Sequence, residues 1–260
     1  EGFDMKILRY EYQGEERYGS IENDLLKVIE EDVFGDFKVT DKTILLKNVR
    51  ILPPVIPSKI VAVGLNYVRH VTELVKDRKA PKAPLLFMKP STSVIGPEEN
   101  IIHPRKSNEV HYEGELAVVI KKRANQIGSE EVKSHILGYT CLNDVTARDW
   151  QREDGQWTRG KSFDTFCPIG PVIVTDIENP NNLKIETRLN GEVKQSSSTS
   201  YLLFKVEELV SYISEHMTLL PGDIIATGTP EGVGSMVAGD RVEVEIENIG
   251  VLRNYVMNEI

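Results

Sequence analysis

The chain has 260 residues, 40% of them hydrophobic and 27% charged, which is typical of a globular protein with one large domain and room for a small appendage. Its formal net charge of −9 argues against a nucleic-acid partner, because phosphate binding depends on clustered lysine and arginine, and no apolar run approaches the roughly 20 residues that cross a bilayer. Two cysteines, Cys141 and Cys167, are too few for a secreted disulfide framework, so the sequence predicts a cytoplasmic protein without a membrane partner.

The N-terminal part of the chain predicts a small β-region. Residues 1–4 precede the first methionine and are expected to be a cloning remnant. Residues 5–52 alternate apolar and polar side chains in short runs, which indicates a few antiparallel strands. Three prolines within residues 53–57 then interrupt the pattern without a long flexible linker. We therefore expect an N-terminal β-region over residues 1–57 that packs on a main domain over residues 58–260.

The main domain is predicted to be rich in strands and poor in helices. Asn190-Gly191 is a strong signal for a β-hairpin, and no βαβ alternation of the nucleotide-binding type is present. This pattern favours a β-rich α+β fold, a rolled mixed sheet or sandwich. Strands are expected at residues 60–63, 85–88, 115–120, 136–142, 172–174, 185–189, 224–226 and 241–246, and helices at residues 130–134 and 204–216.

Two glutamates open one of the expected strands. The two-residue period of a strand places Glu113 and Glu115 on the same face, where their charges repel unless a proton or a cation intervenes. Asp144, just after another expected strand, is a third candidate ligand, and three hard oxygen ligands suit Mg²⁺ or Mn²⁺ better than zinc. From the residues alone, a solvated strand face and an unrelated loop acid remain the alternative.

Several longer motifs occur in one order along the chain. They are G-L-N-Y at residues 64–67, E-G-E at 113–115, N-D-V-T-A-R-D at 143–149, K-S-F-D-T-F-C-P-I-G-P at 161–171 and P-G-D-I-I-A-T-G-T-P-E-G-V-G at 221–234. Together they resemble the fumarylacetoacetate hydrolase family over roughly residues 58–257. The resemblance implies the mixed β-sandwich roll of that family's C-terminal domain, a homodimer and a Mg²⁺ or Mn²⁺ cofactor.

The resemblance also implies roles for individual residues. It makes the metal ligands Glu113, Glu115 and Asp144, the substrate-binding residues Tyr67, Arg148, Gln151 and Thr229, and the catalytic residues His70, Glu73 and Lys161. His70 and Glu73 are three residues apart, so Glu73 can orient the imidazole if the segment is helical. Taken alone, a His–Glu pair or a lysine is more often simply solvated.

The implied reaction is Mg²⁺-dependent hydrolysis of a C–C bond in an acylpyruvate, through a metal-stabilised enolate of a small anionic 2-oxo acid. Shorter family members suggest two alternatives that share the metal and the enolate. One is decarboxylation or tautomerisation of oxaloacetate, and the other is isomerisation and decarboxylation of 2-hydroxyhepta-2,4-diene-1,7-dioate in homoprotocatechuate breakdown. A non-catalytic metal-binding β-domain is a further alternative, although it would have no use for Lys161 or the His70–Glu73 pair.

Overall fold

The computed structural model describes residues 5–69 and 80–260, and far more of these residues lie in β-strands than in helices. The largest sheet has twelve strands among the described residues. Its order is β4 (Lys38–Leu45), β3 (Leu25–Glu30), β2 (Glu15–Glu22), β1 (Lys6–Tyr12), β14 (Cys167–Val174), β12 (Ile136–Asn143), β11 (Gly114–Ile120), β17 (Ile224–Ala226), β6 (Ile60–Gly64) and β7 (Leu85–Lys89), with β5 (Arg50–Ile51) on β1 and β8 (Val94–Ile95) on β14. The expected β-rich fold is confirmed.

The remaining strands of the described residues form two smaller sheets. A five-stranded sheet runs β16 (Glu192–Ser198), β15 (Lys184–Leu189), β19 (Arg241–Ile246), β20 (Gly250–Asn258) and β9 (Asn100–His103), and a three-stranded sheet runs β13 (Thr146–Ala147), β10 (Val110–Tyr112) and β18 (Gly234–Met236). The expected hairpin joins β15 to β16, and both turn residues, Asn190 and Gly191, have the positive φ that such a turn requires.

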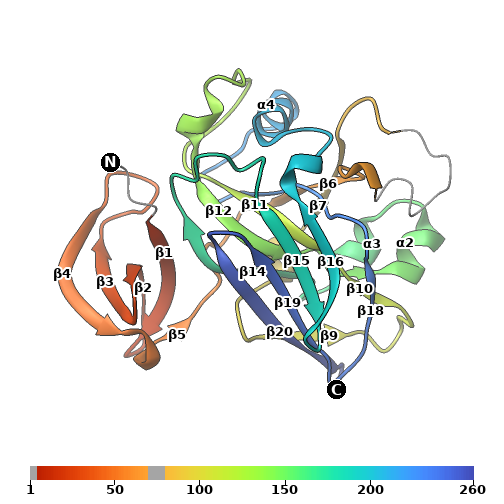
Figure 1. Cartoon of the computed structure of the whole chain (residues 1–260), viewed down its shortest axis with the longest axis horizontal. Helices are drawn as coiled ribbons and strands as arrows, with labels where there is room; N and C mark the ends of the chain where they lie inside the picture. Colours follow the sequence, from red (N-terminus) through yellow and green to blue (C-terminus); the bar gives the residue numbers. More distant parts are fainter. Residues whose placement is uncertain (1–4, 70–79) are drawn as a thin grey trace.

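The N-terminal strands extend the large sheet, rather than only packing on the main domain. Strands β1 to β4 are antiparallel, as the alternating pattern predicts, and β1 pairs with β14 through Lys6 and Ile7. Figure 1 shows these strands on one side of the molecule, opposite the short helices α2 (Arg148–Asp154) and α3 (Thr158–Lys161). The boundary near residue 57 stays a prediction.

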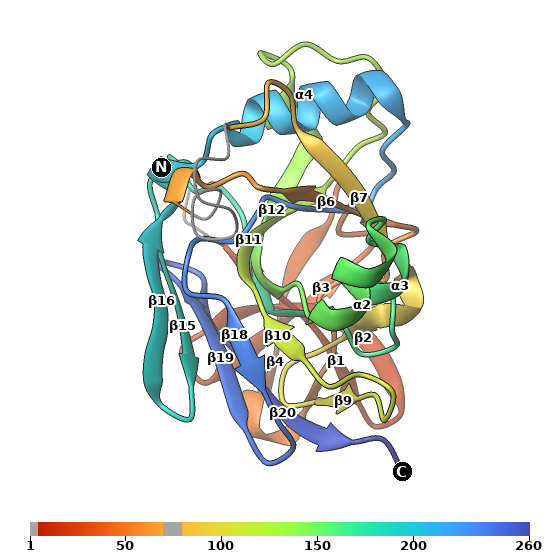
Figure 2. The same cartoon turned by 90° about the vertical axis from the view of Figure 1, so that its right-hand side faces the viewer.

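Helices are short and few in the described part of the chain. The expected helix at residues 204–216 is α4 (Val206–His216). The helix expected at residues 130–134 is absent, and only residues 132–134 of that range lie in a 3₁₀ turn, Val132–His135. Further 3₁₀ turns lie at Leu46–Asn48, Ser91–Ser93 and Thr199–Tyr201. In Figure 2, α4 runs across one end of the molecule, and α2 and α3 lie side by side. Within the described ranges, no helix has both the length and the apolar character that crossing a bilayer requires.

Strand β11 is buried along its whole length and has apolar residues on both faces. Leu116 and Val118 face a core shared with the five-stranded sheet and α4, whereas Ala117 and Val119 face a second core on the other side. Because side chains alternate, Glu115 lies on the same face as Ala117, at the end of a strand that packing holds on both sides. This strand end carries the candidate site.

Candidate active site

The strand register brings three carboxylates together at one end of the large sheet. Gly114 opens β11 and pairs with Asn143, the last residue of β12, so the neighbouring Glu113 and Asp144 meet. The Asp144 N–H donates to the Glu113 carbonyl at 2.8 Å. Glu113, Glu115 and Asp144 are all buried, and each has a carboxylate oxygen within 4.8 Å of the others. We call these three residues the acidic triad.

The triad fits a divalent metal by its geometry and by its donor atoms. Three buried charges of one sign at this distance repel one another, and a cation between them removes the repulsion. Carboxylate oxygens are the ligands that Mg²⁺ and Mn²⁺ prefer, and no cysteine or histidine belongs to the cluster within the described ranges. The acidic triad could therefore bind a metal of this kind.

Two buried lysines neutralise part of the triad. Lys161, the last residue of α3, places its Nζ 2.8 Å from Glu113 Oε2 and 2.5 Å from Asp144 Oδ2. Lys89, the last residue of β7, places its Nζ 2.6 Å from the other Asp144 oxygen, Oδ1, and 3.0 Å from the Val145 carbonyl. The sequence pattern did not single out Lys89, because a lysine at the end of an apolar strand is usually exposed.

The pKa shifts follow from this crowding. Burial raises the pKa of Glu115 well above its usual range, and repulsion from Asp144 and Glu113 raises it further. Burial alone would lower the pKa of Lys161, but the carboxylates of Asp144 and Glu113 outweigh it and the net shift is upward. Lys161 therefore stays an ammonium, whereas Glu115 holds a proton to higher pH than an ordinary glutamate does.

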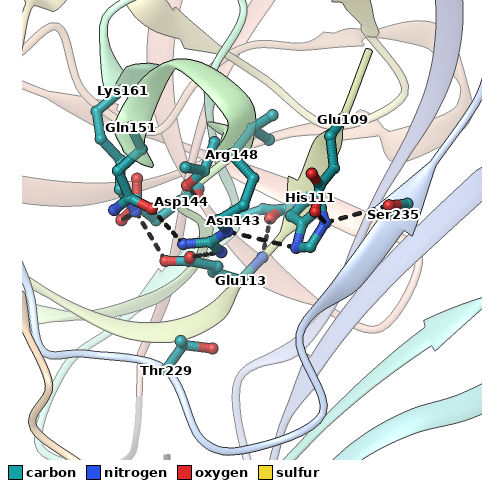
Figure 3. A network of polar contacts seen from close by, with 12 residues as sticks. Glu109, His111, Glu113, Asn143, Asp144, Arg148, Gln151, Lys161, Thr229 and Ser235 are labelled. Carbon is teal, nitrogen blue, oxygen red and sulfur yellow. Dashed lines mark hydrogen bonds and ion pairs between the residues drawn. The ribbon is translucent and has the colours of Figure 1, made fainter. Parts of the chain in front are cut away.

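Arg148, the first residue of α2, lies in a second polar network beside the triad (Figure 3). Its guanidinium forms an ion pair with Glu113 and donates to Gln151 Oε1 at 2.6 Å. Its Nε also lies 3.4 Å from His111 Nδ1, and because an arginine N–H can only donate, this ring nitrogen accepts. Burial and the nearby Arg148 lower the pKa of His111, which keeps the imidazole neutral. His111 Nε2 then donates to Glu109 Oε1 at 2.9 Å.

A cavity of about 420 Å³ opens onto these groups. Its lining includes the acidic triad and four of the other expected site residues, Lys161, Arg148, Gln151 and Thr229. Phe87 and Trp157 form an apolar wall, with their ring centroids 5.2 Å apart in an edge-to-face arrangement. The structure thus brings into one pocket residues that are more than 100 positions apart in the sequence.

The expected site residues differ in what their polar atoms contact. The Thr229 hydroxyl donates to the Gly114 carbonyl at 2.9 Å, so its proton is engaged by the main chain, and it is the Gly228 N–H that donates to Glu115, at 2.8 Å. Tyr67 is fully buried and does not line the cavity. Burial raises the pKa of its hydroxyl, and the nearby Glu115 carboxylate raises it further. His70 and Glu73 lie outside the described residues.

The comparisons with known proteins agree with this geometry. The family model described as "Fumarylacetoacetate (FAA) hydrolase C-terminal" matches residues 59–257, and a second model, "Rv2993c-like, N-terminal", matches residues 5–54. The chain belongs to the fumarylacetoacetate hydrolase family. The mitochondrial oxaloacetate tautomerase Fahd2a of Rattus norvegicus is 47% identical over 221 residues, which cover 81% of this chain and 70% of that protein.

Solved structures of other proteins are similar over nearly the whole chain. The 2-hydroxyhepta-2,4-diene-1,7-dioate isomerase of Mycobacterium marinum is 42% identical, with a TM-score of 0.91 over 98% of this chain and 99% of its own. Maleylpyruvate hydrolase of Sphingobium, solved with manganese(II) and pyruvate, is 28% identical, with a TM-score of 0.81 over 98% and 100% of the two chains. These matches confirm the expected family and fold.

The chain is therefore an enzyme of the fumarylacetoacetate hydrolase family, and the alternative of a non-catalytic metal-binding domain is wrong. The choice of metal ion, the homodimer and the roles of the single site residues stay predictions. The cellular compartment also stays a prediction, since the rat relative is mitochondrial by its name.

Proposed function

We propose that this enzyme interconverts the keto and enol forms of a small 2-oxo acid with the help of Mg²⁺ or Mn²⁺, and that oxaloacetate is its first substrate to test. One observation carries the proposal: three carboxylates, Lys161 and Arg148 line one cavity of about 420 Å³. The name of the tautomerase relative, at 47% identity, favours oxaloacetate.

The charges of the site suit an anionic substrate. The three acids of the triad are matched by three buried cations, Lys161, Lys89 and Arg148, each in direct contact with Glu113 or Asp144. A divalent cation held by the triad would add two positive charges and would polarise the 2-oxo group as a Lewis acid. The negative charges of a 2-oxo carboxylate and of the enolate formed from it would balance this excess.

Residues of the chain itself would orient the substrate and stabilise charge. The carbonyl oxygen of a 2-oxo acid becomes negative when a base takes the C3 proton and the electron pair of that C–H bond forms the C2=C3 bond, and the return of a proton to this oxygen gives the enol. Lys161 is the ammonium placed to stabilise that oxygen. Its Nζ lies 2.8 Å from Glu113 Oε2 and 2.5 Å from Asp144 Oδ2, and because the residue is only 2% exposed, water does not screen its charge. The amide nitrogen of Gln151 would donate to the substrate carboxylate, since its oxygen already accepts from Arg148.

The test is a stopped-flow measurement of the ultraviolet absorbance of the oxaloacetate enol. Wild-type protein with Mg²⁺ should speed the approach to equilibrium above the rate with Mg²⁺ alone, and EDTA should abolish the difference. Lys161→Met should lose most of the rate, whereas Lys59→Met, which removes a lysine paired with Asp223 away from the cavity, should retain it. Equal rates with Mg²⁺ in the presence and absence of protein would refute the proposal.

Hydrolysis of an acylpyruvate is the second candidate, favoured by the similarity to the maleylpyruvate hydrolase that was solved with pyruvate. Here His70, oriented by Glu73, is proposed to activate the attacking water. His70→Ala should then lower kcat on an acylpyruvate by roughly 10²–10⁴, the usual effect of removing a positioned base. The assay is coupled detection of pyruvate, and a full rate of pyruvate release by His70→Ala would count against the pair.

A further inference from the structure

A second arginine lies at the solvent end of the cavity. Arg148 and Arg152 are four residues apart on α2, so they share a face of the helix and are separated by one turn, about 6 Å along its axis. Both line the cavity. The Arg148 side chain is 7% exposed and contacts the triad, whereas the Arg152 side chain is 60% exposed. The cavity therefore has an arginine at both its inner and its outer end.

Glu109 holds the Arg152 guanidinium in position. Its Nη1 lies 3.2 Å from Glu109 Oε1 and its Nη2 forms an ion pair with Glu109 Oε2, a two-point contact that fixes the plane of the guanidinium. Glu109 is itself held by His111, at 2.9 Å. An arginine carries five N–H groups, and among the described residues Glu109 accepts from two of them. The remaining N–H groups can donate to a ligand.

The shape of the cavity decides which part of a substrate reaches Arg152. The triad and Lys161 are buried, so a 2-oxo acid whose 2-oxo carboxylate end binds there can extend only toward the solvent end. Gly64 and Trp157 both line the cavity and are closely packed, because a Cβ on Gly64 would overlap the Trp157 ring. A group remote from the 2-oxo carbon therefore extends toward the solvent end of the cavity, where the exposed Arg152 lies.

We propose that Arg152 selects 2-oxo acids that carry a second carboxylate at the end remote from the 2-oxo group. This inference rests on the proposed function, since it places the 2-oxo end at the triad. A carboxylate and a guanidinium form paired hydrogen bonds, and an uncharged ester or methyl group at the same place forms none. Glu109 competes with that carboxylate for the same guanidinium, so it weakens the selection while it orients Arg152.

Binding is measured by calorimetry on the Mg²⁺-loaded protein with two stable probes. Oxalylglycine has a 2-oxo carboxylate head and a remote carboxylate, and its amide nitrogen prevents enol formation. Its glycine methyl ester has an uncharged methyl ester in place of the remote carboxylate. The wild type should bind the diacid about fivefold more tightly than the ester, the upper end of the effect of an exposed charged pair.

The variants should change the preference for the diacid in opposite directions. Arg152→Met should abolish the preference for the diacid and leave binding of the ester unchanged, Arg152→Lys should keep part of it, and Glu109→Gln should increase it. Arg159→Met is the matched control, because Arg159 is also an exposed arginine paired with an acid, Asp154, but does not line the cavity. The control should bind both probes as the wild type does.

The outcomes separate this inference from the proposed function. A wild type without preference for the diacid, or a preference that survives in Arg152→Met, overturns the role of Arg152. A clear preference that Arg152→Met removes supports that role even if oxaloacetate is not turned over, a result that would refute only the proposed tautomerase activity.

Discussion

Lys89→Met is expected to destabilise the metal-free protein by about 3 kcal/mol, although Lys89 belongs to none of the motifs of the sequence. The ammonium is 1% exposed and makes two contacts, with Asp144 Oδ1 at 2.6 Å and with the Val145 carbonyl at 3.0 Å. Methionine preserves most of the volume but leaves a buried carboxylate oxygen and a carbonyl without this donor. Breaking a buried ion pair costs about 3–5 kcal/mol, and the low end applies because Lys161 still neutralises Asp144 Oδ2.

Lys59→Met is the matched control for this effect. Lys59 also pairs with a fully buried aspartate, Asp223, but it is itself 18% exposed at its side chain. Asp223 keeps other donors when the lysine is removed, namely the N–H groups of Ser58, Lys59 and Leu220 and the Ser58 hydroxyl. We therefore expect a loss of about 1 kcal/mol, typical of a single hydrogen bond.

The measurement is urea unfolding followed by tryptophan fluorescence, with EDTA and again with saturating Mg²⁺. Metal should recover part of the loss in Lys89→Met, because a cation at the triad again neutralises Asp144, and should stabilise Lys59→Met only as much as the wild type. If Lys89→Met loses no more stability than Lys59→Met, or if Mg²⁺ does not reduce the difference, the charge balance inferred for the triad is wrong.

Three further predictions concern the metal and the cavity. Because the pKa of Glu115 is raised in the folded state, the metal-free protein should lose stability as the pH rises from the unfolded pKa of about 4.3 through the raised folded pKa. The stabilisation by Mg²⁺ should increase over the same pH range. Thermal unfolding at several pH values measures both effects, and a pH-independent Mg²⁺ effect would contradict this prediction. Oxalate, which presents two adjacent carboxylates like the planar enolate of pyruvate, should inhibit competitively only with metal present, and equal calorimetric affinity for metal-free protein would argue against chelation at the triad. Gly64→Ala should raise KM several-fold with little change in kcat. The reason is that the new Cβ overlaps the Trp157 ring and must displace this ring into the cavity. An unchanged KM would show that the Trp157 wall does not limit substrate access.

The carboxylates proposed as metal ligands could be picked out from the sequence because part of their signal is local, although only the family resemblance favoured a metal site over a solvated strand face. Glu113 and Glu115 obey the two-residue period of one strand, and the register of β11 with β12 then brings Asp144 to them. Lys89 has no such signal, since its partner Asp144 is 55 positions away and only the folded sheets bring the two together. The same holds for Arg152, whose glutamate partner is 43 positions away.

Some elements of the fold could not be predicted from the sequence for similar reasons. Helices α2 and α3 have seven and four residues, too few to show a helical period, although they carry Arg148, Gln151 and Lys161. The pairing of β1 with β14 joins residues almost 170 positions apart, so alternation in the N-terminal strands could predict strands but not the sheet they extend. The motif that suggested Tyr67 for substrate binding could not reveal that the residue is fully buried and is not part of the cavity lining.

The contact between the Gly228 N–H and Glu115 spans 113 positions, and this separation has a consequence for how the protein folds. Loops of this length close late, because their entropy must be lost before the contact forms. Metal can therefore bind strongly only after the central strands have assembled, and it cannot help to nucleate them. Mg²⁺ should slow unfolding while it leaves the refolding rate nearly unchanged, so its protection is kinetic and acts on the finished molecule.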